Sequence, residues 1–277
     1  MTHLEGGRPP LEGVTVVVTR ARAQAEPLFS ALLRVGAHVV ALPVIAIADP
    51  SDHGDAMRRA VALVTQNHYD WVVFSSVNAV ERFVGILGEG QGFGHAQIAA
   101  VGEATSAALS AHGLSTDLVP QFASAAALTA AMPGATLSAR SAPTSATTDA
   151  VRGRVLFPCA AEAREVLASS LRAKGWVVDD VEAYRTVAAG PNDGATEEAL
   201  EAASNADVVT FTSPSTVRFY VELAAGRRTP PVVACIGPVT ARAASRAGLR
   251  VDAVAQVQSA DGLVRALVEH RAGRRAP

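Results

Sequence analysis

The sequence predicts an α/β protein built from two similar doubly wound domains, each with a parallel sheet that carries helices on both faces. The first observation is a repeat: Asp70–Val80 (DWVVFSSVNAV) and Asp207–Val217 (DVVTFTSPSTV) are identical at five of eleven positions and similar in pattern at a spacing of 137 residues. Each segment is an apolar, β-branched run that ends in small hydroxyl residues, which is the pattern of a buried strand followed by a polar turn. Second, strand and helix patterns alternate along the chain, which indicates parallel sheets. Third, 277 residues suit two domains of ordinary size.

Two further repeats extend the duplication over most of the chain. Residues 102–128 match residues 237–263 at a spacing of 135, with shared Gly, Thr, Asp, Val, Gln, Ser and Leu residues. Near the start, residues 14–47 correspond to residues 154–186 at a spacing of 139. The small differences in spacing are those of short insertions in loops. Agreement of this kind indicates that an ancestral half was duplicated.

The first copy begins with a strand at residues 14–18 and a helix whose apolar residues recur at helical spacing until Gly36, a residue typical of helix ends. The next segment, 39–47, is extended, and Pro43 places it at a sheet edge or in a linker because proline cannot donate a backbone hydrogen bond. A helix with one apolar face then leads into the repeated strand that starts at Asp70.

The helix after this strand is followed by a strand at residues 98–101 and a helix that ends at Gly113. The second copy repeats the same order of elements. Between the copies, residues 137–150 (LSARSAPTSATTDA) are of low complexity and are predicted to be disordered. The glycine cluster at 88–94 follows a helix and lacks the GxGxxG spacing of a dinucleotide site, so we interpret it as a flexible surface loop.

Composition excludes several classes of function. The formal charge is −2 and Lys174 is the only lysine, so no basic field exists to hold nucleic acid, and an anionic ligand would need local groups. Cys159 and Cys235 lie in apolar strand patterns with no cysteine or spaced histidine nearby, which favours core thiols of a reducing compartment over a disulfide or metal site. The N-terminus has no signal-peptide pattern and no segment reaches the length of a membrane span, so a soluble cytoplasmic protein is expected.

The candidate site lies beyond the carboxyl ends of the strands, where ligands bind in open parallel sheets. Turns there are rich in hydroxyl residues and glycine, and they present backbone N–H groups and helix N-termini to a carboxylate or phosphate. Two duplicated domains that face each other would line a cleft from both sides. For any single Ser or Thr, capping of the next helix is the alternative, so the functional interpretation depends on the matched pairs of turns. The candidate substrate-binding residues from these turns are Thr19, Arg20, Ser75, Ser76, Asn78, Gly102, Thr105, Thr212, Ser213, Ser215, Thr216, Gly237 and Thr240.

Tyr184 is the candidate for acid catalysis. It is one of three tyrosines and lies in the extended segment that mirrors 39–47, either as a half-buried linker aromatic or as a phenol donor in the cleft. The sequence contains no GxSxG, Walker or HExxH motif and no spaced carboxylate pair. An enzyme with these residues would act through shape and positioning, and we expect no metal and no cofactor.

Six motifs in order resemble the uroporphyrinogen-III synthase family: VTR near the start, DWVVFSSVNAV, IAAVGEATSAAL, VEAYRT, VTFTSPSTV and CIGPVTARAA. The resemblance covers residues from about 14 to 267 and is specific as an ordered set. It implies two doubly wound domains joined by a two-stranded linker, with the first strand and helix packed on the C-terminal half. The implied division is a flexible tail at 1–13, domain 1 at 14–38 with 187–277, linker strands at 39–47 and 178–186, and domain 2 at 48–177 with the loop 137–150.

The resemblance implies that the chain converts hydroxymethylbilane into uroporphyrinogen III, with inversion of the last pyrrole ring and loss of water, in tetrapyrrole biosynthesis. Arg20 and the backbone N–H groups would hold the eight carboxylates of this substrate, and Tyr184 would help to protonate the departing hydroxyl. One departure is Cys159 at the repeat position of Arg20, where the family often places a basic residue. Arg164, one turn into the following helix, is the candidate replacement.

Two other interpretations compete with the enzyme. A non-catalytic, tetrapyrrole-sensing or regulatory module of the same fold is one, since a fold does not fix a function. A generic two-lobed binding protein is the other, although it explains the duplication and not Tyr184. For the enzyme we expect a monomer and a transient contact with the enzyme that forms the bilane.

Overall fold

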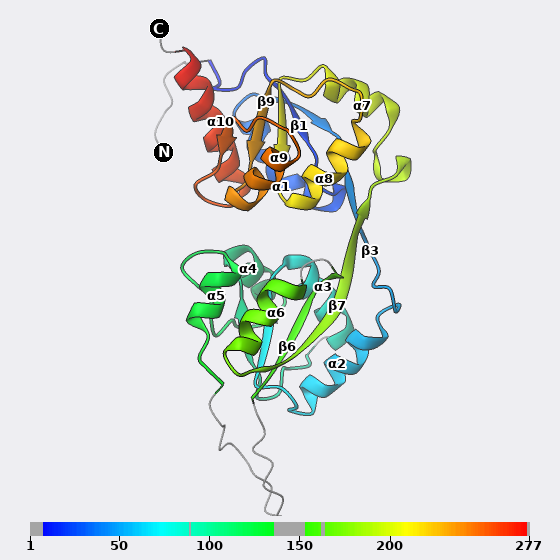
Figure 1. Ribbon diagram of the computed structural model, residues 1–277, viewed down its shortest axis with the longest axis vertical. Coiled ribbons are helices and arrows are strands. Elements are labelled where there is room, and N and C mark those ends of the chain that lie inside the picture. Colours follow the sequence, from blue (N-terminus) through cyan, green and yellow to red (C-terminus); the bar gives the residue numbers. More distant parts are fainter. Residues whose placement is uncertain (1–7, 89, 136–152, 162–163, 276–277) are drawn as a thin grey trace, which may run out of the picture. The chain divides into compact units, whose positions relative to one another are not determined.

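The structure, a computed structural model, describes residues 8–88, 90–135, 153–161 and 164–275. Its contacts divide the chain into two units, unit 1 with Met1–Ile47 and Val187–Pro277, and unit 2 with Ala48–Thr186. Each unit contains one five-stranded, mainly parallel sheet and its own helices (Figure 1). The predicted fold class, two similar doubly wound α/β domains, is confirmed.

Unit 1 has the strand order β10-β9-β8-β1-β2, and all four neighbouring pairs are parallel. Its strands are β1 (Thr15–Val18), β2 (His38–Ala41), β8 (Val208–Phe211), β9 (Val232–Cys235) and β10 (Ala253–Val254). Its helices are α1 (Glu26–Arg34), α7 (Glu197–Ser204), α8 (Pro214–Leu223), α9 (Pro238–Arg246) and α10 (Ala260–Arg275).

Side chains of successive strand residues in unit 1 enter two separate cores, because they alternate between the faces of a sheet. Val16 and Val18 pack with apolar residues of α1 and α10 on one face. Val17 packs with residues of α7, α8 and α9 on the other. A strand buried on both faces must be apolar throughout, which explains the run of valines that the sequence shows here.

Unit 2 has the strand order β3-β7-β6-β4-β5. The pairs β4–β5, β4–β6 and β6–β7 are parallel. Its strands are β3 (Ile45–Ala48), β4 (Trp71–Phe74), β5 (Gln97–Ala100), β6 (Arg154–Ala160) and β7 (Val177–Ala188). Its helices are α2 (Asp55–Thr65), α3 (Val77–Leu87), α4 (Glu103–Ala111), α5 (Ala125–Ala131) and α6 (Arg164–Ala173).

Helices also cover both faces of the unit 2 sheet. Val73 belongs to a core with residues of α5 and α6. Its neighbour Phe74 faces the opposite side, where its ring meets Phe83 of α3 edge to face at a centroid distance of 5.4 Å. Helix α3 in turn contacts α2 and α4. The chain passes from one unit to the other within β3 and within β7.

Each unit combines strands from both copies of the repeat. Unit 1 takes β1 and β2 from the first copy and β8, β9 and β10 from the second, whereas unit 2 takes β4 and β5 from the first and β6 and β7 from the second. Equivalent strands occupy equivalent places in the two sheets. The pairing of β10 with β9 through Ala253 and Ala234 also has a counterpart in unit 2, where Leu118 bridges Ala99, 135 residues earlier in each case. The duplication inferred from the sequence is therefore visible in the topology.

The aspartates that open the repeated motifs have a structural role. The carboxylate of Asp70 accepts a hydrogen bond from the backbone N of Arg154 at 2.8 Å, and that of Asp207 accepts one from Thr15 N at 2.8 Å. In both cases the donor opens the neighbouring strand from the other copy. Aspartates 117 and 252 likewise accept from the backbone N of residues 98 and 233. These carboxylates satisfy backbone N–H groups at the amino ends of the sheets.

Four predicted segments differ in detail from the structure or lie outside it. The extended segment 39–47 is two strands that flank Pro43: β2 joins the unit 1 sheet, and only β3 pairs with β7. Segment 178–186 is part of β7, which pairs with β6 in the unit 2 sheet. In the glycine cluster 88–94, the described glycines are exposed and lie in no helix or strand, as expected of a surface loop, but Phe93 is buried and stacks on Phe83. The predicted disordered loop 137–150 lies outside the described residues.

Within the described ranges, no helix combines the length and the apolar character that are needed to cross a bilayer. The same part of the chain holds no group of three or more His, Cys, Asp and Glu residues that could bind a metal ion. Cys159 and Cys235 are buried and form no disulfide with each other. Burial raises the pKa of the Cys235 thiol to about 11.

Candidate functional site

In unit 2, the carboxyl end of β4 carries the turn Ser75–Ser76, after which α3 begins. Ser76 is the N-cap of α3, and its Oγ accepts a hydrogen bond from Ala79 N at 3.2 Å. The same Oγ accepts a second hydrogen bond, from the phenol of Tyr184, at 3.1 Å. The predicted catalytic tyrosine therefore contacts the predicted hydroxyl-rich turn, through a hydrogen bond between residues 108 positions apart in the sequence.

The fold explains how Tyr184 reaches this turn. Tyr184 lies on β7 and Ser76 follows β4, and β6 runs between these two strands. The register of β6 and β7 shifts by one residue next to Ala160, so that Ala160 pairs with Tyr184. Such a bulge redirects side chains and is common beside functional sites. Because alanine is small, the phenol can pass over the end of β6, where Tyr184 is only 7% exposed.

The hydroxyl of Ser76 keeps one hydrogen for a further partner. A hydroxyl has one donor hydrogen and two acceptor lone pairs, and Ala79 N and Tyr184 occupy the two lone pairs. Both donors draw electron density from the oxygen, as does the positive end of the α3 dipole. The arrangement can thus donate a proton or a strong hydrogen bond to a group placed at this turn.

The next turn in each sheet has glycine in place of serine. Gly102 is the N-cap of α4 and Gly237 that of α9, and no side chain of the described residues caps either helix. In α4 the N–H groups of Glu103 and Ala104 are therefore available to an anion, since Thr105 N already donates to Gly102 O. In α9 fewer donors remain, because its first residue, Pro238, has no N–H. A Cβ on Gly102 would lie 2.7 Å from Cβ of Ala123, and one on Gly237 would lie 3.0 Å from the side chain of Gln258. Close packing therefore requires glycine at Gly102, whereas at the equivalent Gly237, 135 residues further on, the flexible side chain of Gln258 would have to shift by only a few tenths of an ångström.

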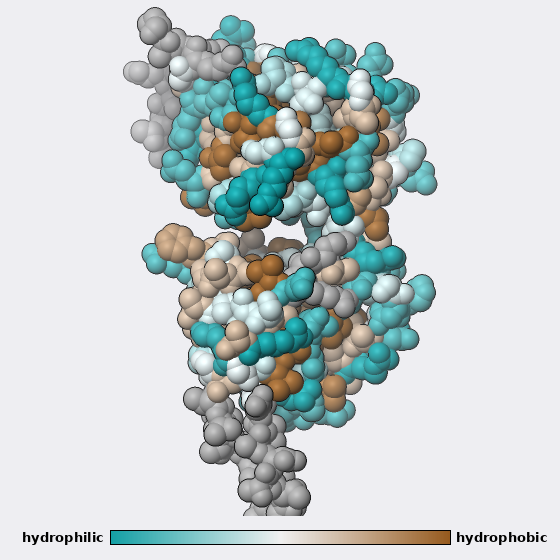
Figure 2. Space-filling model, viewed as in Figure 1, coloured by the Kyte–Doolittle hydropathy of each residue, from teal (hydrophilic) through white to brown (hydrophobic). Residues whose placement is uncertain are grey.

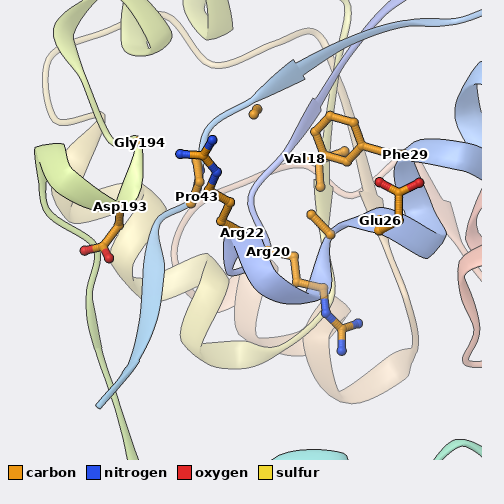
Figure 3. A pocket seen from close by; sticks show the side chains of 10 residues that line it. Val18, Arg20, Arg22, Glu26, Phe29, Pro43, Asp193 and Gly194 are labelled. Atoms are coloured by element: carbon orange, nitrogen blue, oxygen red, sulfur yellow. The ribbon is translucent and has the colours of Figure 1, made fainter.

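In unit 1, a pocket of about 390 Å³ lies at the carboxyl ends of β1 and β2 and includes Arg20. Arg22, Glu26, Phe29 and Asp193 also line it (Figure 3). The guanidinium groups of Arg20 and Arg22 point in different directions (Figure 3).

The charges in this pocket favour an anionic ligand. Burial lowers the pKa of Arg20, but a guanidinium remains charged at neutral pH. Its Nε donates to Oε1 of Gln24 at 3.4 Å, a long and weak bond. Among the described residues, neither Arg20 nor Arg22 has a carboxylate within ion-pair distance. The acids are engaged with other groups, since Asp193 accepts from Gly190 N and Glu26 accepts from Ser30.

Several hydroxyl side chains in unit 1 are structural. Thr19 is fully buried, and its Oγ1 donates to the carbonyl of Thr210 at 2.7 Å, while Thr210 Oγ1 donates back across the sheet to Val17 O. Ser213 caps α8 by accepting from Thr216 N, and the buried Thr216 donates to Ser213 O. Thr19 therefore bridges two strands, and Ser213 and Thr216 form the capping box of α8, in which the backbone N of each also donates to the side chain of the other.

The candidate residues from the sequence divide between the two units. Thr105 and Thr240 are buried inside the first turns of α4 and α9, as Thr216 is in α8. Arg164 is the first residue of α6, and its side chain is not among those described. Unit 2 holds Ser75, Ser76, Asn78, Gly102, Thr105, Arg164 and Tyr184, and unit 1 holds Thr19, Arg20, Thr212, Ser213, Ser215, Thr216, Gly237 and Thr240.

Sequence reasoning missed Arg22, which shares the pocket with Arg20. The signal was present as two arginines separated by one residue in the turn after the first strand. Cys159, at the repeat position of Arg20, is fully buried near the end of β6, so it provides no surface group there.

Comparisons with known proteins identify the family of this chain. A family model described as uroporphyrinogen-III synthase HemD matches residues 26–265. The uroporphyrinogen-III synthase of Synechococcus elongatus is 30% identical over 275 residues, which covers 93% of this chain and 96% of that protein. The chloroplastic uroporphyrinogen-III synthase of Oryza sativa subsp. japonica is 28% identical over 258 residues, covering 92% of this chain and 80% of that protein.

Solved structures show the same fold. A mutant uroporphyrinogen III synthase from Thermus thermophilus gives a TM-score of 0.60 at 18% identity, covering 94% of this chain and all of that one. The uroporphyrinogen-III synthetase of Helicobacter pylori gives 0.58 at 14% identity, covering 92% and 99%. At such identities the structural likeness supports the fold alone, whereas the family match extends over most of the chain. The chain belongs to the uroporphyrinogen-III synthase family.

Proposed function

We propose that this chain cyclises hydroxymethylbilane to uroporphyrinogen III, with inversion of the last pyrrole ring and release of water, as a hydro-lyase of tetrapyrrole biosynthesis. Family membership supports the reaction class. The observation that carries the proposal within the molecule is the hydrogen bond from Tyr184 to Ser76 at the carboxyl end of β4. It joins an acidic O–H group to a turn of the kind that binds ligands in parallel sheets.

Arg20 and Arg22 are the proposed contacts for carboxylates of the substrate. The bilane carries eight carboxylates, yet the chain has a formal charge of −2, so its attraction for this substrate must come from local groups. The unit 1 pocket offers two guanidinium groups without carboxylate partners among the described residues. The glycine-capped N-termini of α4 and α9 add N–H donors to this set.

Tyr184 is the proposed proton donor, and Ser76 is the group between it and the substrate. The hydroxyl of the bilane leaves as water only after it receives a proton. In the observed arrangement the Tyr184 proton points to Ser76 Oγ, and the Ser76 hydrogen is free for the leaving group. Proton transfer through Ser76 therefore needs no movement of either side chain, and general acid catalysis of this kind typically contributes about 10²–10⁴-fold in rate.

Positioning supplies the rest of the rate acceleration in this proposal. Ring closure is intramolecular, and holding both reacting ends in a near-attack arrangement can lower a barrier by roughly 7–11 kcal/mol. A reaction of this kind needs no nucleophilic side chain, which fits the sequence, where no nucleophile motif was found.

The isomer of the product tests the proposal. Purified protein is supplied with hydroxymethylbilane, and the products are oxidised and separated as type I and type III isomers. Spontaneous closure without inversion gives type I alone, so we expect type III only when the protein is present. A product that contains type I alone would reject the enzyme.

The supply of substrate and the assembly state are parts of the same proposal. Because the bilane closes spontaneously, we expect a transient contact with the enzyme that forms it to limit this loss. We expect a monomer, which sedimentation at assay concentration can measure.

A further inference from the structure

Large apolar side chains are exposed at the carboxyl ends of the sheets. Seven large hydrophobic residues are exposed in the described part of the chain. Four of them directly follow a strand or the bridge at Leu118, and they lie either in the turn there or in the first turn of the next helix. In Figure 2, apolar groups of this kind stand among hydrophilic ones on the surface of both units. The four residues are Phe122, Val166, Val239 and Val257, and the other three are Leu33, Ile86 and Val254.

Phe122 and Val257 are equivalent residues of the two copies, 135 positions apart. Phe122 is 70% exposed and Val257 is 61% exposed. Each residue precedes one that packs on an N-cap glycine: Ala123 lies against Gly102, and Gln258 lies against Gly237. In each unit an exposed apolar residue thus directly precedes a residue that packs on the N-cap glycine of a helix, α4 in unit 2 and α9 in unit 1.

Hydrogen bonds constrain the two turns that carry these residues. Ser124 N donates to Phe122 O at 2.8 Å, and Ser259 N donates to Val257 O at the same distance. Ser124 then caps α5 by accepting from Ala127 N at 3.1 Å, and Ser259 Oγ accepts from Gly262 N at the start of α10. Two exposed apolar residues are therefore held on rigid turns, where they bury little surface and contribute little to folding.

We propose that Phe122 in unit 2 and Val257 in unit 1, each beside the helix N-terminus of its own unit, form apolar contacts with pyrrole rings of a bound tetrapyrrole. The inference rests on the proposed function and names two further contact residues for its substrate. A tetrapyrrole carries carboxylates on apolar aromatic rings, so its binding requires anion donors and apolar surface side by side. The turn at Phe122 provides this combination beside α4, and the turn at Val257 provides it beside α9. The phenyl ring of Phe122 can stack on a pyrrole ring, which makes it the stronger of the two contacts.

The test compares Phe122→Ser with Leu33→Ser. Leu33 is 60% exposed and lies in the last turn of α1, outside the pocket and the turns described above, so it is a matched control for loss of exposed apolar surface. We expect Phe122→Ser to raise the KM for hydroxymethylbilane roughly tenfold with little change in kcat, because stacking on an aromatic side chain typically contributes at this level. Val257→Ser should raise KM several-fold, since valine offers a smaller surface.

Two further measurements make the result specific. Phe122→Tyr keeps the ring and should restore the parent KM, whereas a merely structural role for the turn would not depend on the ring. The melting temperatures of Phe122→Ser and Leu33→Ser should both stay near that of the parent, since both side chains are exposed.

The outcomes separate the two proposals. If the parent makes type III product and the KM of Phe122→Ser equals that of Leu33→Ser, the apolar contact is rejected and the proposed function stands. A parent that makes no type III product rejects both. Loss of self-association in Phe122→Ser, with an unchanged KM, would assign the residue to contact with a second copy and would also overturn the inference.

Discussion

Removal of the Tyr184 hydroxyl is the sharpest perturbation of the proposed chemistry. Tyr184→Phe deletes one oxygen from a side chain that is 7% exposed and breaks the 3.1 Å hydrogen bond to Ser76. The ring remains, so the lost hydrogen bond should lower the free energy of unfolding by only about 1 kcal/mol. If Tyr184 is the acid, kcat should fall by about two orders of magnitude with KM nearly unchanged.

A double-mutant cycle with Ser76→Ala tests whether the two hydroxyls act as one unit. In a shared proton path either single change blocks the path, so the double variant should have a kcat close to that of each single variant. Ser76→Ala also removes the cap of α3, which should cost about 1 kcal/mol of stability, so melting temperatures must accompany the rates. Ser76→Thr keeps the hydroxyl and is the control.

The assay is the initial rate of type III formation at saturating bilane, with the oxidised isomers separated chromatographically. A kcat for Tyr184→Phe equal to that of the parent would remove Tyr184 from the mechanism. Additive losses in the cycle would instead show that Tyr184 and Ser76 act independently, and the path through Ser76 would be wrong.

Three further predictions concern single residues. Arg20→Gln should raise the KM about tenfold at low salt and less at high salt, because it removes a charge-assisted contact, and a KM that does not change would exclude Arg20 from the site. Thr210→Val should lower the free energy of unfolding by about 1 kcal/mol in chemical denaturation, since its buried hydroxyl donates to Val17 O, and unchanged stability would show that this bond contributes nothing. The unfolded Cys235 thiol ionises near its usual pKa while the folded one ionises at about 11, so the parent should lose stability between pH about 9 and 11. Over that window the free energy of unfolding should fall less steeply with pH in Cys235→Ala than in the parent, by about 1.4 kcal/mol per pH unit. Equal slopes in the two proteins would refute the assignment.

Repeats made most of the fold predictable. Asp70 and Asp207 were recognised as the first residues of matching motifs, and the structure gives the reason, since each satisfies a backbone N–H at the start of a neighbouring strand. That neighbouring strand belongs to the other copy of the repeat. The periodicity of one segment does not show which strand of the other copy lies beside it. The exchange of strands between copies therefore came from the family resemblance, not from the pattern.

Local patterns failed where one residue decided the outcome. The segment 39–47 appeared as one extended stretch, but Pro43 ends β2 and the chain then enters β3 in a different sheet. The cluster 88–94 is a loop as predicted, but the pattern does not show that Phe93 anchors it, because its burial depends on the rings of Phe74 and Phe83.

The candidate site was predictable as a set of turns, but not residue by residue. A hydroxyl after a strand can cap a helix or bind a ligand, and the sequence is the same in both cases. Thr19 donates to a backbone carbonyl, whereas Ser76 keeps a free hydrogen because Tyr184 occupies its second lone pair. Only the contact of Tyr184, on β7, with the turn after β4 distinguishes Ser76 from a hydroxyl residue with a purely structural role.

Inversion of the last ring is the central claim, and a doubly labelled substrate tests it most directly. Hydroxymethylbilane is prepared with ¹³C at the hydroxymethyl carbon and at the free α-carbon of the last pyrrole ring, and the product formed by the protein is examined by ¹³C NMR. Closure with inversion joins the labelled α-carbon to the neighbouring ring's bridge, so we predict no one-bond coupling between the two labels. A one-bond ¹³C–¹³C coupling in the protein's product, as in the spontaneous product, would contradict the account.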